Sequence, residues 1–406
     1  MGSILIVGLI LFVGFVLGEA AEKVRLPKIS GYILAGILLN PRLLPVVPET
    51  FTEHTDLITD IALAFITFSV GGTLLVSRIK TLGRTIALTA LFEAEMALVF
   101  VIGGFVGAQA LFGESMSQFQ TGLLIPLSIL LGSLALPTDP SATLAVTHEY
   151  RARGDVSSAV LGVAAFDDAL GIINYSLCIA VAKVLLTGSG LHWTETVFAP
   201  VLDVLGGILV GAAFGLIFNQ ISDYLKRESE GAVIVIVAAT LMLCFGCAKS
   251  LGCDELLSTM AMGCVVANRN PVQDKIFQMI ERYTEELIFV LFFTLSGMHL
   301  MFSAVQGVIG LIILFVLLRV GGKLSGSWLG ARLAGAPRHV RRYTGLCLIP
   351  QGGIVIGLAL SMRGMPEFRD LSDVLIGIVI GAVIIHELIG PVLAKTALFK
   401  SGEITK

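Results

Sequence analysis

Long apolar segments separated by short polar stretches recur along the whole chain. A helix of about 20 apolar residues crosses the roughly 30 Å hydrocarbon core of a bilayer. The pattern therefore predicts an all-α, polytopic membrane protein. We expect thirteen helices, near residues 3–21, 29–44, 54–76, 82–111, 121–149, 154–187, 196–220, 231–250, 254–268, 281–301, 304–334, 338–362 and 371–398.

Basic residues are concentrated in alternate connections between these helices. One set of connections holds 20 of the 27 Lys and Arg residues, whereas the opposite set holds Arg42, Lys249, Arg363 and Arg369. Cytoplasmic connections are the ones enriched in Lys and Arg. We therefore expect the N-terminus outside and the C-terminus in the cytoplasm of a bacterial or archaeal cell, with the chain in its plasma (inner) membrane. Because the two termini then lie on opposite sides of the membrane, the number of membrane-crossing helices must be odd.

The composition narrows the class of protein. Hydrophobic residues make up 55% and charged residues 14% of the 406 positions, with a formal net charge of −3 and a mean hydropathy of +0.91. Soluble domains carry about 25% charged residues, so a soluble enzyme, a disordered protein and a nucleic-acid-binding protein are excluded. No stretch is long and polar enough for a soluble domain, and no ATP-binding loop is present. We expect one transmembrane unit over 1–406: a transporter rather than an enzyme.

A weak internal repeat is present. Residues 31–40 resemble residues 259–268, and residues 65–71 resemble residues 291–297. The two copies lie seven predicted helices apart, and an odd separation makes them inverted relative to each other. Inverted repeats are typical of secondary transporters, whose site lies at the midplane between the repeats.

Two predicted helices contain a break. Residues 136–140 read Leu-Pro-Thr-Asp-Pro, and residues 349–353 read Ile-Pro-Gln-Gly-Gly. Proline removes a backbone donor and blocks a helical carbonyl upstream. Non-helical backbone is tolerated in a membrane only where it lines a buried or watery cavity. We therefore expect the oxygens of Thr138 and Asp139 to face a cavity, with Gln351 in the second break.

Adjacent carboxylates, Asp167 and Asp168, lie near the middle of helix 154–187. A charge at this depth costs about 2.5–3.5 kcal/mol on insertion scales. Such a pair persists when it is protonated or paired with a cation. Burial favours the protonated, neutral form of a carboxyl group, whereas a neighbouring cation favours the charged form. Adjacent helical residues point about 100° apart, so one carboxylate can face a cavity while the other meets a partner.

Cationic and further acidic side chains lie inside other helices. Arg319 and Lys323 are four residues apart and share one helix face. Lysine is the better functional candidate because it loses its proton more readily on burial than arginine. We expect Arg319 to neutralise Glu93 or Glu95. Glu387, beside His386, is expected to serve packing, with gating or proton relay as alternatives.

Several of these motifs together resemble the monovalent cation/proton antiporter superfamily, in its Kef- and Nap-like branch with paired aspartates. The resemblance covers the whole chain in order. It rests on Thr138-Asp139-Pro140, Asp167-Asp168, Gly322-Lys323-Leu324, residues 350–353, residues 386–391 and residues 26–32.

The resemblance implies the fold and the site. It implies a homodimer of thirteen-helix protomers in membrane lipid, with inverted repeats and two crossed discontinuous helices. In each protomer, helices near 54–76, 121–187, 281–301 and 338–398 form a core, and helices near 1–44, 82–111, 196–268 and 304–334 form a dimerisation panel.

It also implies roles for the site residues. Asp168 would bind Na⁺ and H⁺ alternately, Asp167 would pair with Lys323, and Thr138 and Asp139 would frame the ion site. Aspartate at position 167 favours electrogenic exchange, serving pH homeostasis, with no cofactor beyond the transported Na⁺ (or Li⁺) and H⁺.

Alternative functions remain open at this stage. Oxygen ligands suit Na⁺ or Li⁺. The size of the ion cavity would distinguish these ions from K⁺, and the sequence does not give that size, so a K⁺/H⁺ antiporter is an alternative. A sodium-coupled organic-anion symporter of similar fold is a second, although three acidic residues disfavour an anionic substrate. A channel is disfavoured by the repeats and the titratable pair. An intramembrane aspartyl protease needs its aspartates on two facing helices.

Overall fold

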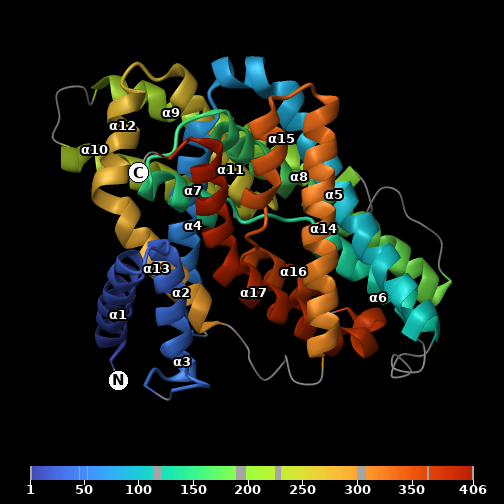
Figure 1. Cartoon of the computed structure of the whole chain (residues 1–406). Helices are drawn as coiled ribbons and strands as arrows, with labels where there is room; N and C mark the ends of the chain where they lie inside the picture. The colour runs from blue at the N-terminus through green and yellow to red at the C-terminus, as the bar shows by residue number, and fades with distance from the viewer. Residues whose placement is uncertain are drawn as a thin grey trace. The chain divides into compact units, whose positions relative to one another are not determined.

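The computed structural model describes residues 2–44, 46–52, 54–112, 121–188, 198–224, 230–299, 308–363 and 365–404. Over these residues the chain is helical and contains no strand (Figure 1). It divides into two compact units, which are described separately. The first comprises Met1–Leu82, Pro140–Arg151 and Leu202–Leu300, and the second comprises Gly83–Asp139, Ala152–Val201 and Met301–Lys406.

Helices of the first unit come from three stretches of the chain. Within it, α2 packs against both α1 and α13, and α4 packs against both α11 and α13. Its elements are α1 (Ser3–Lys23), α2 (Lys28–Leu38), α3 (Glu49–Thr52), α4 (Asp56–Thr73), α7 (Pro140–Glu149), most of α9 (Ala199–Tyr224), α10 (Glu230–Leu251), α11 (Glu255–Arg269), α12 (Gln273–Ile280), the π-helical segment η3 (Glu281–Glu285) and α13 (Glu286–Met298).

The second unit holds both helix breaks and the paired aspartates. Within it, α6 packs against α8, and α17 packs against α14, α15 and α16 (Figure 1). Its elements are most of α5 (Val76–Phe112), α6 (Thr121–Leu134), α8 (Asp155–Thr187), α14 (Ile309–Leu333), α15 (Arg338–Cys347), α16 (Gly353–Arg363), the 3₁₀ turn η5 (Pro366–Phe368) and α17 (Arg369–Ser401).

The expected helices are found, but not all are continuous spans. Among the described residues, eight helices are long and apolar enough to cross a membrane. The other five expected helices correspond to the short α2 and α11, the broken pairs α6–α7 and α15–α16, and the π-interrupted run α12–η3–α13. Each of these five is too short, or is interrupted by a break, to form one uninterrupted helix long enough to cross the membrane. Thirteen crossings therefore stay a prediction.

The internal repeat is visible in how helices of the first unit cross. The repeat aligns α2 with α11 and α4 with α13. In the structure α2 crosses α13, where a Cβ on Gly36 would lie 2.1 Å from the Thr294 carbonyl oxygen. Correspondingly, α4 crosses α11, where a Cβ on Gly71 would lie 2.0 Å from the Met260 carbonyl oxygen. The first helix of each copy therefore crosses the second helix of the other copy, and a glycine lies at each crossing.

Both predicted breaks occur in the second unit, and they lie against each other. Helix α6 ends at Leu134 and α7 begins at Pro140, while α15 ends at Cys347 and α16 begins at Gly353. The Asp139 N–H donates to the Pro350 carbonyl oxygen at 3.0 Å. A Cβ on Gly352 would lie 2.8 Å from Asp139 Oδ2. The fold is therefore all-helical with two crossed discontinuous helices.

A row of glycines on α14 allows α5 to approach closely. Gly322, Gly326 and Gly330 are spaced four residues apart, so they share one helix face. A Cβ on Gly326 would lie 2.2 Å from the Phe92 carbonyl oxygen and 2.6 Å from Glu93 Cα. The two backbones are in contact here, and this contact brings the short Glu93 side chain within reach of α14.

Gly326→Val is expected to destabilise the protein, because the added side chain would meet α5 backbone that cannot move without separating the helices. Overpacking typically costs about 1–3 kcal/mol. The midpoint of thermal unfolding in detergent should fall. Gly310→Val on the same helix, where a Cβ meets nothing within 4 Å, is the control. Equal midpoints for the two variants would contradict this account of the α5–α14 contact.

Candidate functional site

Lys323 lies at the centre of a cluster in the second unit. Its Nζ donates to Glu93 Oε2 at 2.8 Å and Oε1 at 3.1 Å. It also donates to Thr138 Oγ1 at 2.8 Å and to Asp167 Oδ2 at 3.1 Å. The Thr138 hydroxyl in turn donates to Asp167 Oδ2 at 2.5 Å. Residues from α5, α8, α14 and the first break therefore meet at one ammonium group.

The cluster is shielded from the surroundings of the protein. Glu93, Asp167 and Lys323 have 0% of their surface exposed, and Thr138 has 2%. Buried charges persist in proteins when they are paired and hydrogen-bonded. One buried acceptor in the cluster, Asp167 Oδ1, has no hydrogen-bond partner among the described residues. That oxygen is available to a ligand such as a cation.

Arg319 has a different role from the one expected. It donates to the carbonyl oxygens of Ala135 at 2.9 Å, Pro137 at 2.9 Å and Ile349 at 2.7 Å. These carbonyls belong to the two breaks, where no helical N–H is in place to satisfy them. Arg319 therefore joins the breaks. Arg319 forms no direct ion pair with Glu93 or Glu95 among the described residues, since Glu93 accepts from Lys323 and Glu95 accepts from Asn174 Nδ2 at 3.0 Å.

The other residue expected in the second break contributes to the same frame. Gln351 Nε2 donates to the Leu134 carbonyl oxygen at 2.7 Å, and Gln351 Oε1 lies 3.0 Å from His386 Nδ1. His386 and Glu387 are buried in α17, with 1% and 2% of their surface exposed. Gln351 thus links the end of α6 to α17 across the breaks.

Asp139 and Asp168 are the two remaining residues of the expected site. Asp139 lies in the first break and is 7% exposed. Asp168 follows Asp167 on α8, but its side chain lies outside the described residues. Its assigned role as the alternating Na⁺ and H⁺ ligand therefore stays a prediction.

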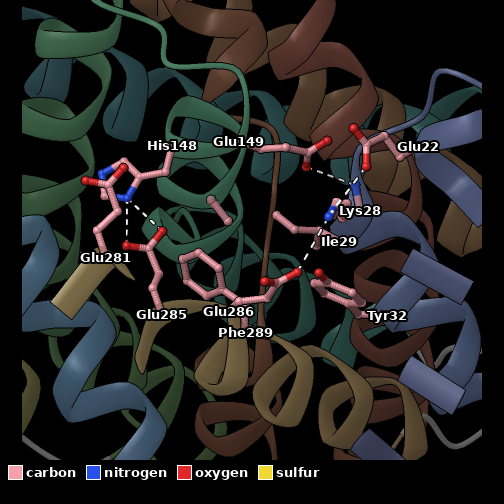
Figure 2. A pocket seen from close by; sticks show the side chains of 11 residues that line it. Glu22, Lys28, Ile29, Tyr32, His148, Glu149, Glu281, Glu285, Glu286 and Phe289 are labelled. Carbon is pink, nitrogen blue, oxygen red and sulfur yellow. Dashed lines mark hydrogen bonds and ion pairs between the residues drawn. The ribbon is translucent and has the colours of Figure 1, made fainter. Parts of the chain in front are cut away.

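A separate, mixed-charge pocket of about 280 Å³ lies within the first unit (Figure 2). Lys28 Nζ is 2.5 Å from Glu19 Oε1 and 3.5 Å from Glu286 Oε1, and the Lys28 N–H donates to Glu149 Oε2 at 2.9 Å. Carboxylates outnumber cations in the lining. The lining residues are Glu22, Lys28, Ile29, Tyr32, Ala145, His148, Glu149, Glu281, Glu285, Glu286 and Phe289.

In the same pocket, His148 on α7 contacts the π-helical segment. Its Nδ1 lies 2.7 and 2.8 Å from the two oxygens of Glu285 (Figure 2). A π-helical turn often marks a functional position in a helix. The contact fixes the end of the second half of the broken helix to η3.

Three features of the structure were not predicted from the sequence. The first is the pairing of Glu93 with Lys323, both of which lie in apolar helices. The second is the close crossing of α5 and α14, for which the four-residue spacing of Gly322, Gly326 and Gly330 is the visible signal. The third is the pocket, whose residues come from five separate elements and carry no common spacing.

The arrangement offers oxygen ligands of the kind that bind small cations. It combines crossed backbone breaks, a free carboxylate oxygen on Asp167, the Thr138 hydroxyl and an ammonium group that competes for the same carboxylate. A cation on Asp167 Oδ1 would compete with Lys323 on Oδ2 for the charge of one carboxylate, so binding of the cation and placement of the ammonium group would be linked.

Comparisons with known proteins agree with this architecture. The family model described as "Sodium/hydrogen exchanger, transmembrane" matches residues 7–399. The probable Na⁺/H⁺ antiporter GerT of Bacillus cereus is 22% identical over 84% of this chain and 86% of its own. The ammonium/H⁺ antiporter subunit AmhT of Alkalihalophilus pseudofirmus is 22% identical over 92% of this chain and 91% of its own.

A solved structure shows the same fold. The sodium proton antiporter MjNhaP1 from Methanocaldococcus jannaschii, determined at pH 8, matches with a TM-score of 0.71 and 20% identity, covering 98% of each chain. The family model spans nearly all of the sequence. The chain belongs to the sodium/hydrogen exchanger family.

Proposed function

We propose that the Asp167–Asp168 pair, Thr138 and Asp139 form the ion site of this multi-pass membrane protein. As a member of the sodium/hydrogen exchanger family, the protein exchanges Na⁺ for H⁺. The observation that carries the site assignment is the buried oxygen of Asp167 that has no hydrogen-bond partner among the described residues, beside crossed breaks and an ammonium group.

In the proposed cycle the site faces one side of the membrane at a time. Na⁺ binds when Asp168 is deprotonated, with carboxylate, hydroxyl and backbone oxygens as ligands. A rearrangement of the core helices against the panel helices then exposes the site to the other side, where protons displace the ion. Exchange is obligatory if the empty, charged site crosses poorly.

The finer features of the branch are also proposals. We assign the chain to the two-aspartate branch with electrogenic exchange, because an aspartate stands at position 167. We also propose a homodimer in the cell membrane of a bacterium or archaeon, with the N-terminus outside and the C-terminus in the cytoplasm. Ion gradients alone would drive transport, with no cofactor, no ATP and no enzymatic reaction.

The identity of the cation is tested directly by transport. Purified protein is reconstituted in vesicles with an imposed pH gradient, and NaCl, LiCl, KCl or choline chloride is added. We expect Na⁺ and Li⁺ to collapse the gradient and choline to leave it. A response to K⁺ alone would favour the K⁺/H⁺ alternative, and no response to any cation from folded protein would contradict cation/proton exchange.

A further inference from the structure

A carboxylate from outside α8 caps the start of that helix. Glu403, which follows α17, accepts from the N–H groups of Val156 at 2.6 Å and Ser157 at 2.8 Å. The Arg153 N–H donates to the Glu403 carbonyl oxygen at 3.3 Å. The first N–H groups of a helix have no partner within it, and a carboxylate suits them because the helix dipole is positive at this end. Glu403 therefore serves as the cap of α8.

The residues on both sides of this contact leave room for it and hold it in place. Gly154, at the N-cap position of α8, has no side chain to cap the helix. A Cβ on Gly154 would overlap the carboxylate carbon of Glu403. Gly402 ends α17 in the left-handed conformation, at φ 84°, and the Glu403 N–H donates to the Leu398 carbonyl oxygen at 3.1 Å. The turn after α17 thus directs the carboxylate to α8.

The two helices that Glu403 joins each carry part of the proposed ion site or of its frame. Helix α8 carries Asp167 and Asp168. Helix α17 carries His386, whose Nδ1 lies 3.0 Å from Gln351 Oε1 in the second break. Both helices also pack against α15 within the second unit. The axial position of α8 relative to α17 therefore decides where the two aspartates lie relative to the breaks.

A contact at the start of α8 can act on the site because an α-helix is stiff along its axis. Asp167 lies twelve residues after Asp155, the first residue of α8, which is about 18 Å along the helix axis. An axial shift at the start of the helix is therefore transmitted to the aspartates. Binding sites require their ligands to be held within about 0.5 Å of the productive geometry, so a small shift is enough to weaken cation binding.

We propose that Glu403 is a positioning residue for the ion site, because it caps α8 from α17 and so fixes the axial position of Asp167 and Asp168 relative to the breaks. This role rests on the proposed ion site. It differs from capping alone, since a cap within α8 would satisfy the same N–H groups without joining the helix to α17.

Glu403→Ala is expected to raise the apparent KM for Na⁺ severalfold, with a smaller change in the maximal rate, and to lower the midpoint of thermal unfolding. The KM is taken from initial rates of Na⁺-dependent proton flux in vesicles, over a series of NaCl concentrations at fixed pH. Asp370→Ala is the control. Asp370 also lies in the first turn of a helix, α17, but it is exposed, and this variant should keep the wild-type KM.

A second substitution separates positioning from capping. Aspartate is a favoured N-cap residue, and residue 154 has extended backbone, with φ 170° and ψ −166°, that aspartate can adopt. Added to Glu403→Ala, Gly154→Asp should cap α8 again and restore the midpoint, whereas the KM should stay raised because the link to α17 is still missing. Gly154→Asp alone should also raise the KM, since its side chain takes the space of the Glu403 carboxylate. This single variant serves if Glu403→Ala does not fold.

The KM and the midpoint together decide between the two roles. A KM that stays raised in the double variant while the midpoint recovers supports the positioning role. A wild-type KM in Glu403→Ala or in Gly154→Asp, or a KM that follows the midpoint in every variant, would overturn it and leave Glu403 as a cap. These results leave Na⁺/H⁺ exchange by wild type intact. Absence of any Na⁺-dependent proton flux in wild type would instead refute the proposed function.

Discussion

Asp168→Asn is expected to reduce Na⁺-dependent proton flux to the level of empty vesicles. The amide has nearly the same shape as the carboxylate, but it carries no charge for a cation and binds no exchangeable proton near neutral pH. Both substrates therefore lose the same ligand at once. Flux is measured with a fluorescent pH probe, beside the elution volume and thermal midpoint of the purified variant.

The control for Asp168→Asn is Asp370→Asn, which removes an exposed carboxylate from the first turn of α17 in the same unit. This variant should exchange at the wild-type rate. Normal exchange by folded Asp168→Asn protein would contradict the site assignment. Loss of exchange in both variants would show that the assay detects a general effect of carboxylate removal.

Lys323→Ala is expected to lower the stability of the protein strongly. It removes the ammonium group that pairs with both Glu93 and Asp167, so two fully buried acidic side chains are left without that cation. Breaking a buried ion pair by removing one partner costs about 3–5 kcal/mol. The midpoint of thermal unfolding in detergent should fall by several degrees, and protonation at lower pH should restore part of the loss.

Lys183→Ala provides the matched control for Lys323→Ala. Lys183 also pairs with a glutamate, Glu367, at 3.0 Å, but 42% of its side chain is exposed. Exposed pairs contribute about 0–1 kcal/mol, so its midpoint should change little. A Lys323→Ala midpoint equal to that of Lys183→Ala would show that the cluster does not hold the second unit together.

Much of the fold could be predicted because its causes are local. Apolar length predicts a helix, and a proline-rich motif predicts a break, so the breaks at Leu134–Pro140 and Cys347–Gly353 occur where Pro137, Pro140 and Pro350 place them. The π-helical turn at Glu281–Glu285 was not predicted. No residue in that segment differs in kind from those of an ordinary helix, so the interruption depends on packing.

The candidate site could be predicted in its residues but not in all of its pairings. Spacing along α14 places Arg319 and Lys323 on one face, but it does not say which carboxylate each meets. That depends on how α5 is rotated and how closely it approaches, which the Gly322–Gly326–Gly330 face decides. The hydrogen-bond partners of Arg319 were missed for this reason, since they are carbonyl oxygens that are left as acceptors only after both breaks have formed.

The central claim is that Na⁺ and H⁺ move in opposite directions through one coupled site. The most direct measurement is uphill proton movement driven by sodium alone. Vesicles loaded with Na⁺ at equal internal and external pH are diluted into Na⁺-free buffer, with the membrane potential clamped. The account predicts that the interior becomes acidic in wild type and stays neutral in Asp168→Asn. Sodium loss without acidification would contradict it, because that is the behaviour of a channel.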